Sequence, residues 1–357
     1  MKKIAIFILT LFTFFRVQAQ VVEGTIYDSK TRETIPGAAI YLDGTSIITT
    51  SDKDGRFRLV IENKMNTSLV FSHLSYESIV IKPPFEGLGN AFYLKEKVHT
   101  LAEARVVAHR DLFPPDTKMR VFREQFLGKS IAGRSCVIRN EQDIELTYNS
   151  GTHTLVAIAR NPIIVENKHL SYLVTFDLHH FSIQYTENTL NMDKAIKITF
   201  KGTSSFVDQN PYNVRYKTRR DEIHLRSKQY FFKHLVNHTL PEGKFRLFNR
   251  LTRIEAADYF IIPHTGIDKT VMLIPETNIR RTHERVVERP IYGVVGILCD
   301  DRYRSEVVFL TNRILVDGFG NPDTIDHLIF FGDLGEQRLG DMLPIDYSFV
   351  RPQTSRR

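Results

Sequence analysis

The chain has 357 residues, of which 42% are hydrophobic, 11% aromatic and 25% charged. These fractions are ordinary for a globular protein and exclude a disordered, collagenous or low-complexity chain. Two cysteines are too few for a disulfide scaffold or a four-thiolate zinc site, and the net charge of +7 is a modest basic excess. At about 100–200 residues per domain, the length predicts two folded domains.

The N-terminus has the layout of a secretory signal peptide. Lys2 and Lys3 precede an apolar run over residues 4–15, and Val17-Gln18-Ala19 places small residues at the −3 and −1 positions of a cleavage site. The run is too short for a permanent span of a bilayer about 30 Å thick, although a retained anchor is the alternative. We therefore expect residues 1–19 to be removed, leaving no transmembrane span, a net charge of +4 and a location in the periplasm or at the outer membrane.

Residues 21–94 consist of short extended segments separated by turn signals. In residues 56–61, Phe57, Leu59 and Ile61 alternate with more polar positions, which is the period of a half-buried strand. Short strands at such close spacing predict a small β-sandwich.

Several ordered motifs in this region carry a specific resemblance. They are Gly24-x-x-x-Asp28, Ile35-Pro36-Gly37-Ala38, Asp43-Gly44-Thr45, Asp52-x-Asp54-Gly55-x-Phe57 and Phe71-Ser72-x-Leu74-x-Tyr76. Together they resemble the carboxypeptidase regulatory-like domain, a transthyretin-like sandwich that often begins exported proteins of Bacteroidota, including TonB-dependent receptors. The resemblance implies a folding or docking module, over residues 20–97, without chemistry of its own.

The segment Asp52-x-Asp54-Gly55 also has the appearance of a calcium loop. If its two aspartates take the third and fifth positions of an EF-hand loop, Ile61 falls at the twelfth, where a bidentate glutamate is needed. We therefore interpret the segment as a tight turn, in which aspartate binds nearby backbone and Gly55 adopts a positive φ.

Residues 98–115 are expected to form a linker, since Pro114 and Pro115 favour extended backbone. Residues 116–357 are predicted to form one larger, antiparallel, β-rich (α+β) domain with two or three helices. Apolar spacing predicts one helix over residues 118–127, ended by Gly128, and another within residues 219–238. Strands are expected, among other places, over residues 253–262, 270–274, 291–298, 306–316 and 324–331, and a short helix over residues 335–342. The fold class is therefore mainly β.

The larger region resembles uncharacterised Bacteroidota proteins through strings such as Asp341-Met342-Leu343-Pro344-Ile345-Asp346-Tyr347. That resemblance implies no reaction and no functional residue. A TonB-dependent receptor is a further alternative, but residues 116–357 are far too few for a plug and a 22-stranded barrel.

Motifs of catalysis are missing from the sequence. There is no His-x-x-Glu or His-Glu-x-x-His zinc pair, no Gly-x-Ser-x-Gly elbow and no phosphate-binding loop. We therefore assign no catalytic, cofactor-binding or metal-ligating residue and expect no cofactor. A triad assembled from distant positions stays open.

The clearest charged feature is a basic stretch over residues 215–233. Arg219, Arg220, Arg226 and Lys228 are the candidate contacts for an anion or partner. Guanidinium groups hold phosphates or carboxylates, so lipopolysaccharide, an acidic glycan or an outer-membrane protein would fit, whereas an exported protein rarely meets nucleic acid. A solvated helix face with local ion pairs is the alternative.

The two cysteines, Cys136 and Cys299, both occur in strand-like surroundings. An oxidising periplasm permits a disulfide between them, and two buried free thiols are the alternative.

These observations predict an exported, non-catalytic envelope protein that serves as a binding or assembly module. An exported hydrolase of envelope polymers or glycans is the alternative, and a pocket in which histidine meets a carboxylate and Ser or Cys would favour it.

Overall fold

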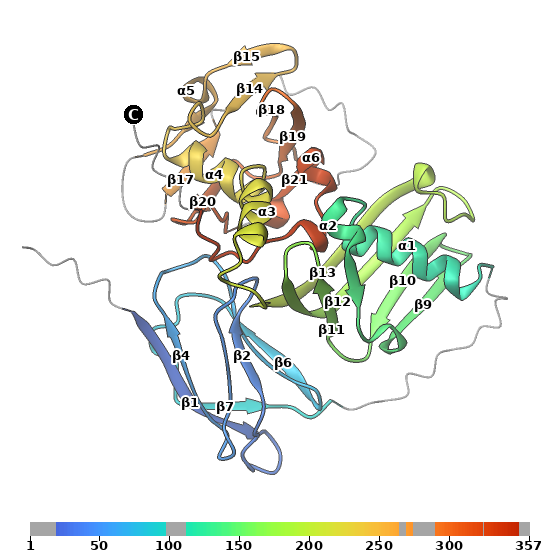
Figure 1. Ribbon diagram of the computed structural model, residues 1–357, viewed down its shortest axis with the longest axis vertical. Helices are drawn as coiled ribbons and strands as arrows, with labels where there is room; N and C mark the ends of the chain where they lie inside the picture. Colours follow the sequence, from blue (N-terminus) through green and yellow to red (C-terminus); the bar gives the residue numbers. More distant parts are fainter. Residues whose placement is uncertain (1–18, 98–111, 264–268, 274–289, 324, 350–357) are drawn as a thin grey trace, which may run out of the picture.

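The computed structural model describes residues 19–97, 112–263, 269–273, 290–323 and 325–349. Figure 1 shows three bodies around the helices α3 (Val214–His224) and α4 (Lys228–Val236). Each body has its own hydrophobic cluster. We call them the sandwich (residues 19–97), the middle body (112–208) and the C-terminal body (228–336). The region that the sequence treats as one domain, residues 116–357, thus contains two hydrophobic clusters. The predicted signal peptide, except for Ala19, and most of the predicted linker lie outside the described residues.

The sandwich confirms the β-sandwich prediction. Two sheets, β4-β1-β7 and β3-β2-β5-β6, pack face to face. In β4, Phe57, Leu59 and Ile61 are buried while the residues between them are exposed, as their alternation predicts. The strands are β1 (Gln20–Asp28), β2 (Ala39–Leu42), β3 (Ile48–Thr50), β4 (Arg56–Ile61), β5 (Leu69–His73), β6 (Tyr76–Ile81) and β7 (Ala91–Leu94).

The segment Asp52-x-Asp54-Gly55 is a tight turn. The Asp52 carboxylate accepts backbone hydrogen bonds from Asp54 (2.9 Å) and Arg56 (2.8 Å). Gly55 has φ +72°, and a Cβ there would lie 2.8 Å from the carbonyl oxygen of Ile26. The turn interpretation is therefore confirmed, since the Asp52 carboxylate is occupied by backbone and Gly55 leaves no room for a side chain.

The middle body consists of a six-stranded sheet crossed by one long helix (Figure 1). Phe122 and Phe126 of the helix pack edge-on against Phe181 and Phe176 of the sheet, at ring distances of 4.8 and 5.1 Å. Gly128 ends the helix with φ +97°, as predicted. The elements are α1 (Pro115–Leu127), α2 (Ile131–Arg134), β8 (Cys136–Ile138), β9 (Ile144–Asn149), β10 (Thr154–Ala159), β11 (Ile163–Asn167), β12 (Tyr172–Tyr185) and β13 (Ala195–Asp208).

The C-terminal body has a five-stranded sheet, β15-β14-β18-β19-β21, and a three-stranded sheet, β16-β17-β20. The helix within residues 219–238 is present as two helices, α3 (Val214–His224) and α4; Phe231, Phe232 and Leu235 of α4 are fully buried. The elements of this body are α4 (Lys228–Val236), β14 (Phe245–Asn249), β15 (Thr252–Ile254), α5 (Ala256–Tyr259), β16 (Phe260–Ile261), β17 (Lys269–Leu273), β18 (Gly293–Cys299), β19 (Tyr303–Phe309), β20 (Arg313–Val316), β21 (Leu328–Gly332) and α6 (Asp333–Glu336).

Two of the predicted strands are wrong. Residues 253–262 contain the end of β15, the helical turn α5 and β16, since two consecutive alanines favour the helical turn. Residues 306–316 are divided between β19 and β20, which belong to different sheets. The Thr311 hydroxyl binds backbone groups of Arg313 there and so competes with strand pairing.

Backbone pairing attaches the sandwich to the middle body. The loop after β2 lies along the end of β13, where Thr45 and Ser205 form a parallel bridge. The amide of Gly44 donates to the carbonyl oxygen of Ser204 (2.7 Å), and that of Phe206 donates to Thr45 (2.9 Å). The sandwich therefore extends the middle sheet by a short additional strand.

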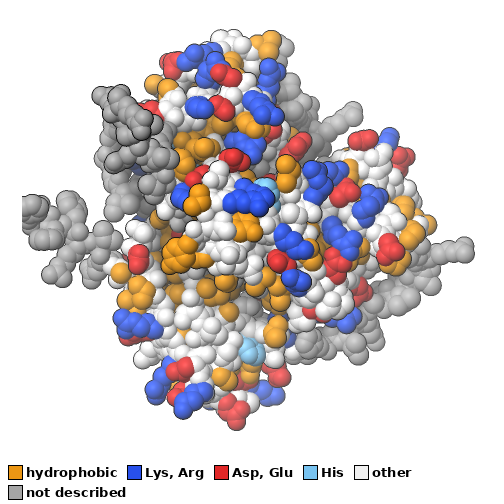
Figure 2. Space-filling view, in the orientation of Figure 1, with side chains coloured by type: hydrophobic (Ala, Val, Ile, Leu, Met, Phe, Trp, Pro, Cys, Tyr) orange, Lys and Arg blue, Asp and Glu red, His pale blue; other side chains and the backbone are white. Residues whose placement is uncertain are grey.

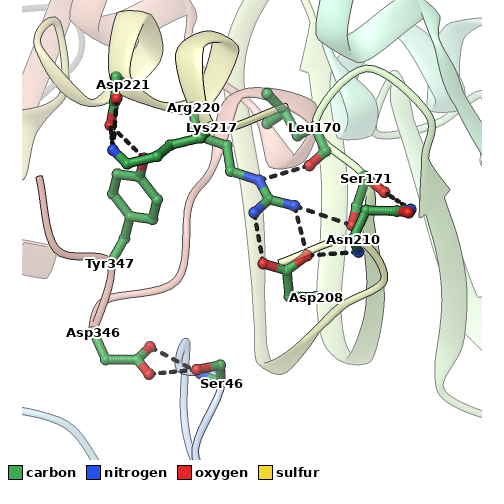
Figure 3. A network of polar contacts seen from close by, with 10 residues as sticks. All are labelled: Ser46, Leu170, Ser171, Asp208, Asn210, Lys217, Arg220, Asp221, Asp346 and Tyr347. Atoms are coloured by element: carbon green, nitrogen blue, oxygen red, sulfur yellow. Dashed lines mark hydrogen bonds and ion pairs between the residues drawn. The ribbon is translucent and has the colours of Figure 1, made fainter. Parts of the chain in front are cut away.

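A segment near the C-terminus, residues 339–349, runs across all three bodies, and we call it the strap. Its apolar residues enter each cluster in turn: Leu343 packs against the middle body, Ile345 against the sandwich and Phe349 against the C-terminal body. Figure 3 shows Asp346 bonded to Ser46 of the sandwich and the Tyr347 hydroxyl donating to Asp221 of α3 (2.5 Å). The strap thus connects segments that are far apart in sequence.

Among the described residues, the longest helix has 13 residues, so none of the described helices is long and apolar enough to cross a bilayer.

Candidate ligand-binding cleft

The basic stretch connects the middle and C-terminal bodies through α3 and the start of α4. In this stretch Arg220 is only 3% exposed. Its guanidinium forms a two-pronged ion pair with Asp208, at 2.6 and 2.7 Å, and its Nε donates to the carbonyl oxygen of Leu170 (Figure 3). It also lies 4.1 Å above the ring centre of Tyr172. The edges of the Arg220 guanidinium are thus hydrogen-bonded inside the protein, and one of its flat faces packs on Tyr172.

The prediction that Arg220 faces an external anion is therefore corrected. A guanidinium buried in a paired, fully hydrogen-bonded site cannot reach a ligand in solvent without breaking that pair. Arg219, its neighbour, is partly buried and donates to the carbonyl oxygen of His169 (3.1 Å). Both arginines fasten α3 to the turn between β11 and β12.

Arg226 and Lys228 contact the C-terminal body instead. The guanidinium carbon of Arg226 lies 4.5 Å from the ring centre of Tyr303, and Nζ of Lys228 lies 4.9 Å from that of Phe330. Burial lowers the pKa of Lys228 to about 8. The four predicted contact residues thus divide between two bodies and do not form one surface. Figure 2 shows Asp and Glu side chains among the Lys and Arg side chains of the visible face.

Two adjoining open cavities of about 480 and 510 Å³ lie along the C-terminal body, and the first also borders the middle body. The first has the end of α1 and residues 128–130 on one side and α6 with β19 on the other. The second lies between the end of α3, the start of α4 and the β18–β19 turn. Arg226, Cys299 and Tyr303 line both cavities, so these residues form a shared wall. We call the pair the cleft. Each cavity is of a size that accepts a small ligand.

Charged groups of both signs line the cleft. Its acidic residues are Glu124, Glu222, Glu242, Asp300, Asp333, Glu336 and Asp341, and its basic residues are Lys129, Arg226, Lys244 and Arg338. Lys129 pairs with Glu124 (3.2 Å) and Lys244 with Asp300 (2.7 Å). Burial raises the pKa of Asp341 and lowers that of Arg338. The cleft carries an acidic excess, which disfavours phosphate-rich ligands.

Both cysteines are free thiols in the structure, so the free-thiol alternative holds and the disulfide is not formed. Cys136 packs at the margin of the middle cluster, whereas Cys299 belongs to the C-terminal cluster. Burial raises the pKa of Cys136 to about 12 and that of Cys299 to about 11. Although Cys299 lines the cleft, its thiol stays protonated at neutral pH and is a weak nucleophile.

Histidine lines neither of the two cavities, so the pocket that would favour a hydrolase is not present there. A serine, a carboxylate and a histidine do meet elsewhere: Ser78 donates to Asp177 (2.8 Å), whose carboxylate lies 3.8 Å from His179. The carboxylate stands in the middle of this group, whereas nucleophilic catalysis needs histidine beside the serine. Among the described residues, no group of His, Cys, Asp and Glu has the arrangement of a metal site.

Comparison with known families supports the first module. Residues 22–106 match the CarboxypepD_reg-like domain. No curated protein matches the chain. The match covers most of the sandwich described above, and none of its described residues, 22–97, lines the cleft. The cleft therefore belongs to the part of the chain that lies outside the family match.

Only one of the predicted contact residues, Arg226, lines the cleft. Tyr303, Arg338 and Asp341 also line it but were not singled out from the sequence. They come from β19, the segment after α6 and the strap, so no local spacing links them to Arg226. Asp341 belongs to the string Asp341 to Tyr347, whose resemblance to uncharacterised proteins assigns no role to it.

Proposed function

We propose that this chain is an exported envelope protein that binds a glycan segment without net negative charge in the cleft. Residues 1–19 support export, because they have the layout of a signal peptide. The CarboxypepD_reg-like domain supports an envelope role, because the resemblance implies a docking module at the start of exported proteins. The protein acts in the periplasm or at the outer membrane by binding and not by catalysis.

The composition of the cleft is the observation that carries this proposal. Arg226 and Arg338 supply donors, while Asp341, Glu336 and Glu222 supply acceptors along the same walls. A sugar hydroxyl both donates and accepts, so a mixed lining satisfies it better than a uniformly basic one would. From the sequence we expected lipopolysaccharide phosphates or an acidic glycan. Because the cleft has an excess of acidic residues, we propose a neutral or amino glycan instead.

The test is binding of envelope glycans that have been separated by charge. We expect the neutral fraction to bind the mature chain and the acidic fraction to bind more weakly, measured by calorimetry. Asp341→Asn and Arg226→Gln should each weaken binding about tenfold, because each removes a charged partner of a ligand hydroxyl. Arg219→Gln is the matched control, since Arg219 lies on the same basic stretch but outside the cleft lining.

Each result has a defined meaning. Equal binding by the control and both cleft variants would place the ligand elsewhere on the molecule. Tighter binding of the acidic fraction would contradict the charge argument. Release of new reducing ends by the wild-type chain would replace binding with the hydrolase alternative.

A further inference from the structure

The contact between the sandwich and the middle body contains a cluster of titratable side chains. Asp43 lies in the loop that pairs with β13, and its carboxylate accepts the amide hydrogen of Ser204 (2.7 Å). Asp177 and His179 lie on β12, with the two side chains 3.8 Å apart, and Asp177 accepts from Ser78 of the sandwich. The cluster therefore spans the two bodies and does not belong to either one.

Water has little access to this contact. Thr45, Tyr41 and Thr203 are at most 5% exposed, and the hydroxyls of Tyr41 and Thr203 are 3.0 Å apart. The Asp177 side chain is 17% exposed. In such surroundings an ionised carboxylate loses much of its hydration.

The groups that face Asp43 come from every element packed around it. Asp43 itself interacts with Tyr41 of β2, with His179 of β12 and with the amides of Gly44 and Ser204, and its backbone amide donates to Ser68. Ser78 of β6 and Lys97, which follows β7, act on Asp177. The Thr203 hydroxyl lies beside that of Tyr41. When protonated, His179 is a counter-charge for Asp177, and the His179 side chain is 45% exposed. The titratable groups are therefore two carboxylates, one imidazole, the Tyr41 phenol and the Lys97 ammonium group.

We propose that docking of the sandwich onto the middle body is controlled by protons, and that uptake of protons by Asp43 and His179 tightens the contact. The proton on Asp43 removes a charge held at a contact that water hardly reaches, and the proton on His179 makes it a cation beside the Asp177 carboxylate. The docked arrangement is therefore favoured at mildly acidic pH, and the contact loosens as the pH rises.

The direction follows from the titration of each group. Burial raises the pKa of Asp43 to about 6, and the Asp177 carboxylate raises the pKa of His179. A raised pKa means that the docked state binds the proton more tightly, so its extra stability is present at low pH and is lost as the pH rises through that pKa. Hydrogen bonds from His179 and Ser78 outweigh burial and lower the pKa of Asp177. Asp177 therefore takes up a proton only in solution more acidic than that in which Asp43 and His179 do.

The test is native-state hydrogen exchange on the full mature chain at pH 5 and pH 8, corrected for intrinsic rates. The reporters are the amides of Gly44 and Phe206, which bond across the contact, and the amide of Ile26, which bonds to Gly55 inside the sandwich, is the internal reference. We expect the docking constant to be about tenfold larger at pH 5, at the two reporters only. Asp43→Asn keeps an oxygen for the Ser204 amide and should remove most of this difference.

Asp54→Asn is the matched control, since it changes an exposed aspartate of the same sandwich and should leave the tenfold difference intact. Equal protection at pH 5 and pH 8 in the wild-type chain overturns the proposal, whatever the variants do. A difference that persists in both Asp43→Asn and His179→Gln overturns it as well. A change of the same size at Ile26 assigns the effect to the whole sandwich and also counts against it.

Discussion

The two contacts of the middle body differ in construction. Toward the sandwich it forms a closed contact, in which backbone pairs along β13 and Thr45, Tyr41 and Thr203 are buried. Toward the C-terminal body it forms a hollow one, where the first cavity of the cleft lies between α1, α6 and β19. A closed contact fixes the position of a module, whereas a hollow one leaves charged groups available to a ligand. The difference is consistent with our proposal that the sandwich positions the chain and that the ligand binds on the other side of the middle body.

The largest expected effect concerns the ion pair that holds α3 to the middle body. Arg220→Met removes the donor of two carbonyl oxygens and leaves the partly exposed Asp208 carboxylate with the amide of Asn210 in place of its ion pair. We expect a loss of about 3–5 kcal/mol in the free energy of unfolding, measured by urea denaturation. Arg215→Met, on the exposed face of the same helix, should change it by less than about 0.5 kcal/mol. Similar losses for both variants would contradict the structural role given to Arg220.

The next effect tests how the strap closes the sandwich contact. Gly44 has φ +74°, and a Cβ there would lie 2.8 Å from Cδ1 of Ile345. Gly37 has φ +73° but has nothing within 4 Å of the same position. Gly37→Ala should therefore cost about 1 kcal/mol through backbone strain alone, and Gly44→Ala about 2–3 kcal/mol in thermal or urea unfolding. Equal costs would mean that Ile345 moves aside freely.

The sequence could predict the local features of the molecule but not the contacts between distant segments. The sandwich, the turn at Gly55 and the helix ending at Gly128 follow from local patterns, because neighbouring residues determine them. Arg220 appeared as one of several basic residues, since its partner Asp208 lies on β13 and local charge counting cannot place it. Arg226 was identified, but its neighbours Tyr303 and Arg338 come together only through the tertiary fold. Local periodicity likewise missed the change of sheet at Thr311.

A smaller effect concerns the bond between the strap and α3. Tyr347→Phe removes the hydroxyl that donates to Asp221, while Lys217 remains as a partner of that carboxylate. We expect a loss of about 1 kcal/mol in the free energy of unfolding. Hydrogen exchange should speed up at the strap amide of Ile345, which bonds to Gly44, and remain unchanged at Ile26. Uniform acceleration at both amides would indicate that the strap does not open separately from the sandwich.

The smallest effect distinguishes the two contacts by thiol chemistry. Because both cysteines are free and their pKa values are raised, a reducing agent should leave the melting temperature unchanged. A small thiol reagent should label both at least about a hundredfold more slowly than a model thiol at pH 8, since only the thiolate reacts. The rate should rise about tenfold per pH unit up to about pH 10.

Cys299 lines the cleft and Cys136 does not, so a ligand of the cleft should slow the labelling of Cys299 alone. Protection of both cysteines by the ligand would mean that binding tightens the whole molecule and would remove the distinction between a positioning contact and a binding one.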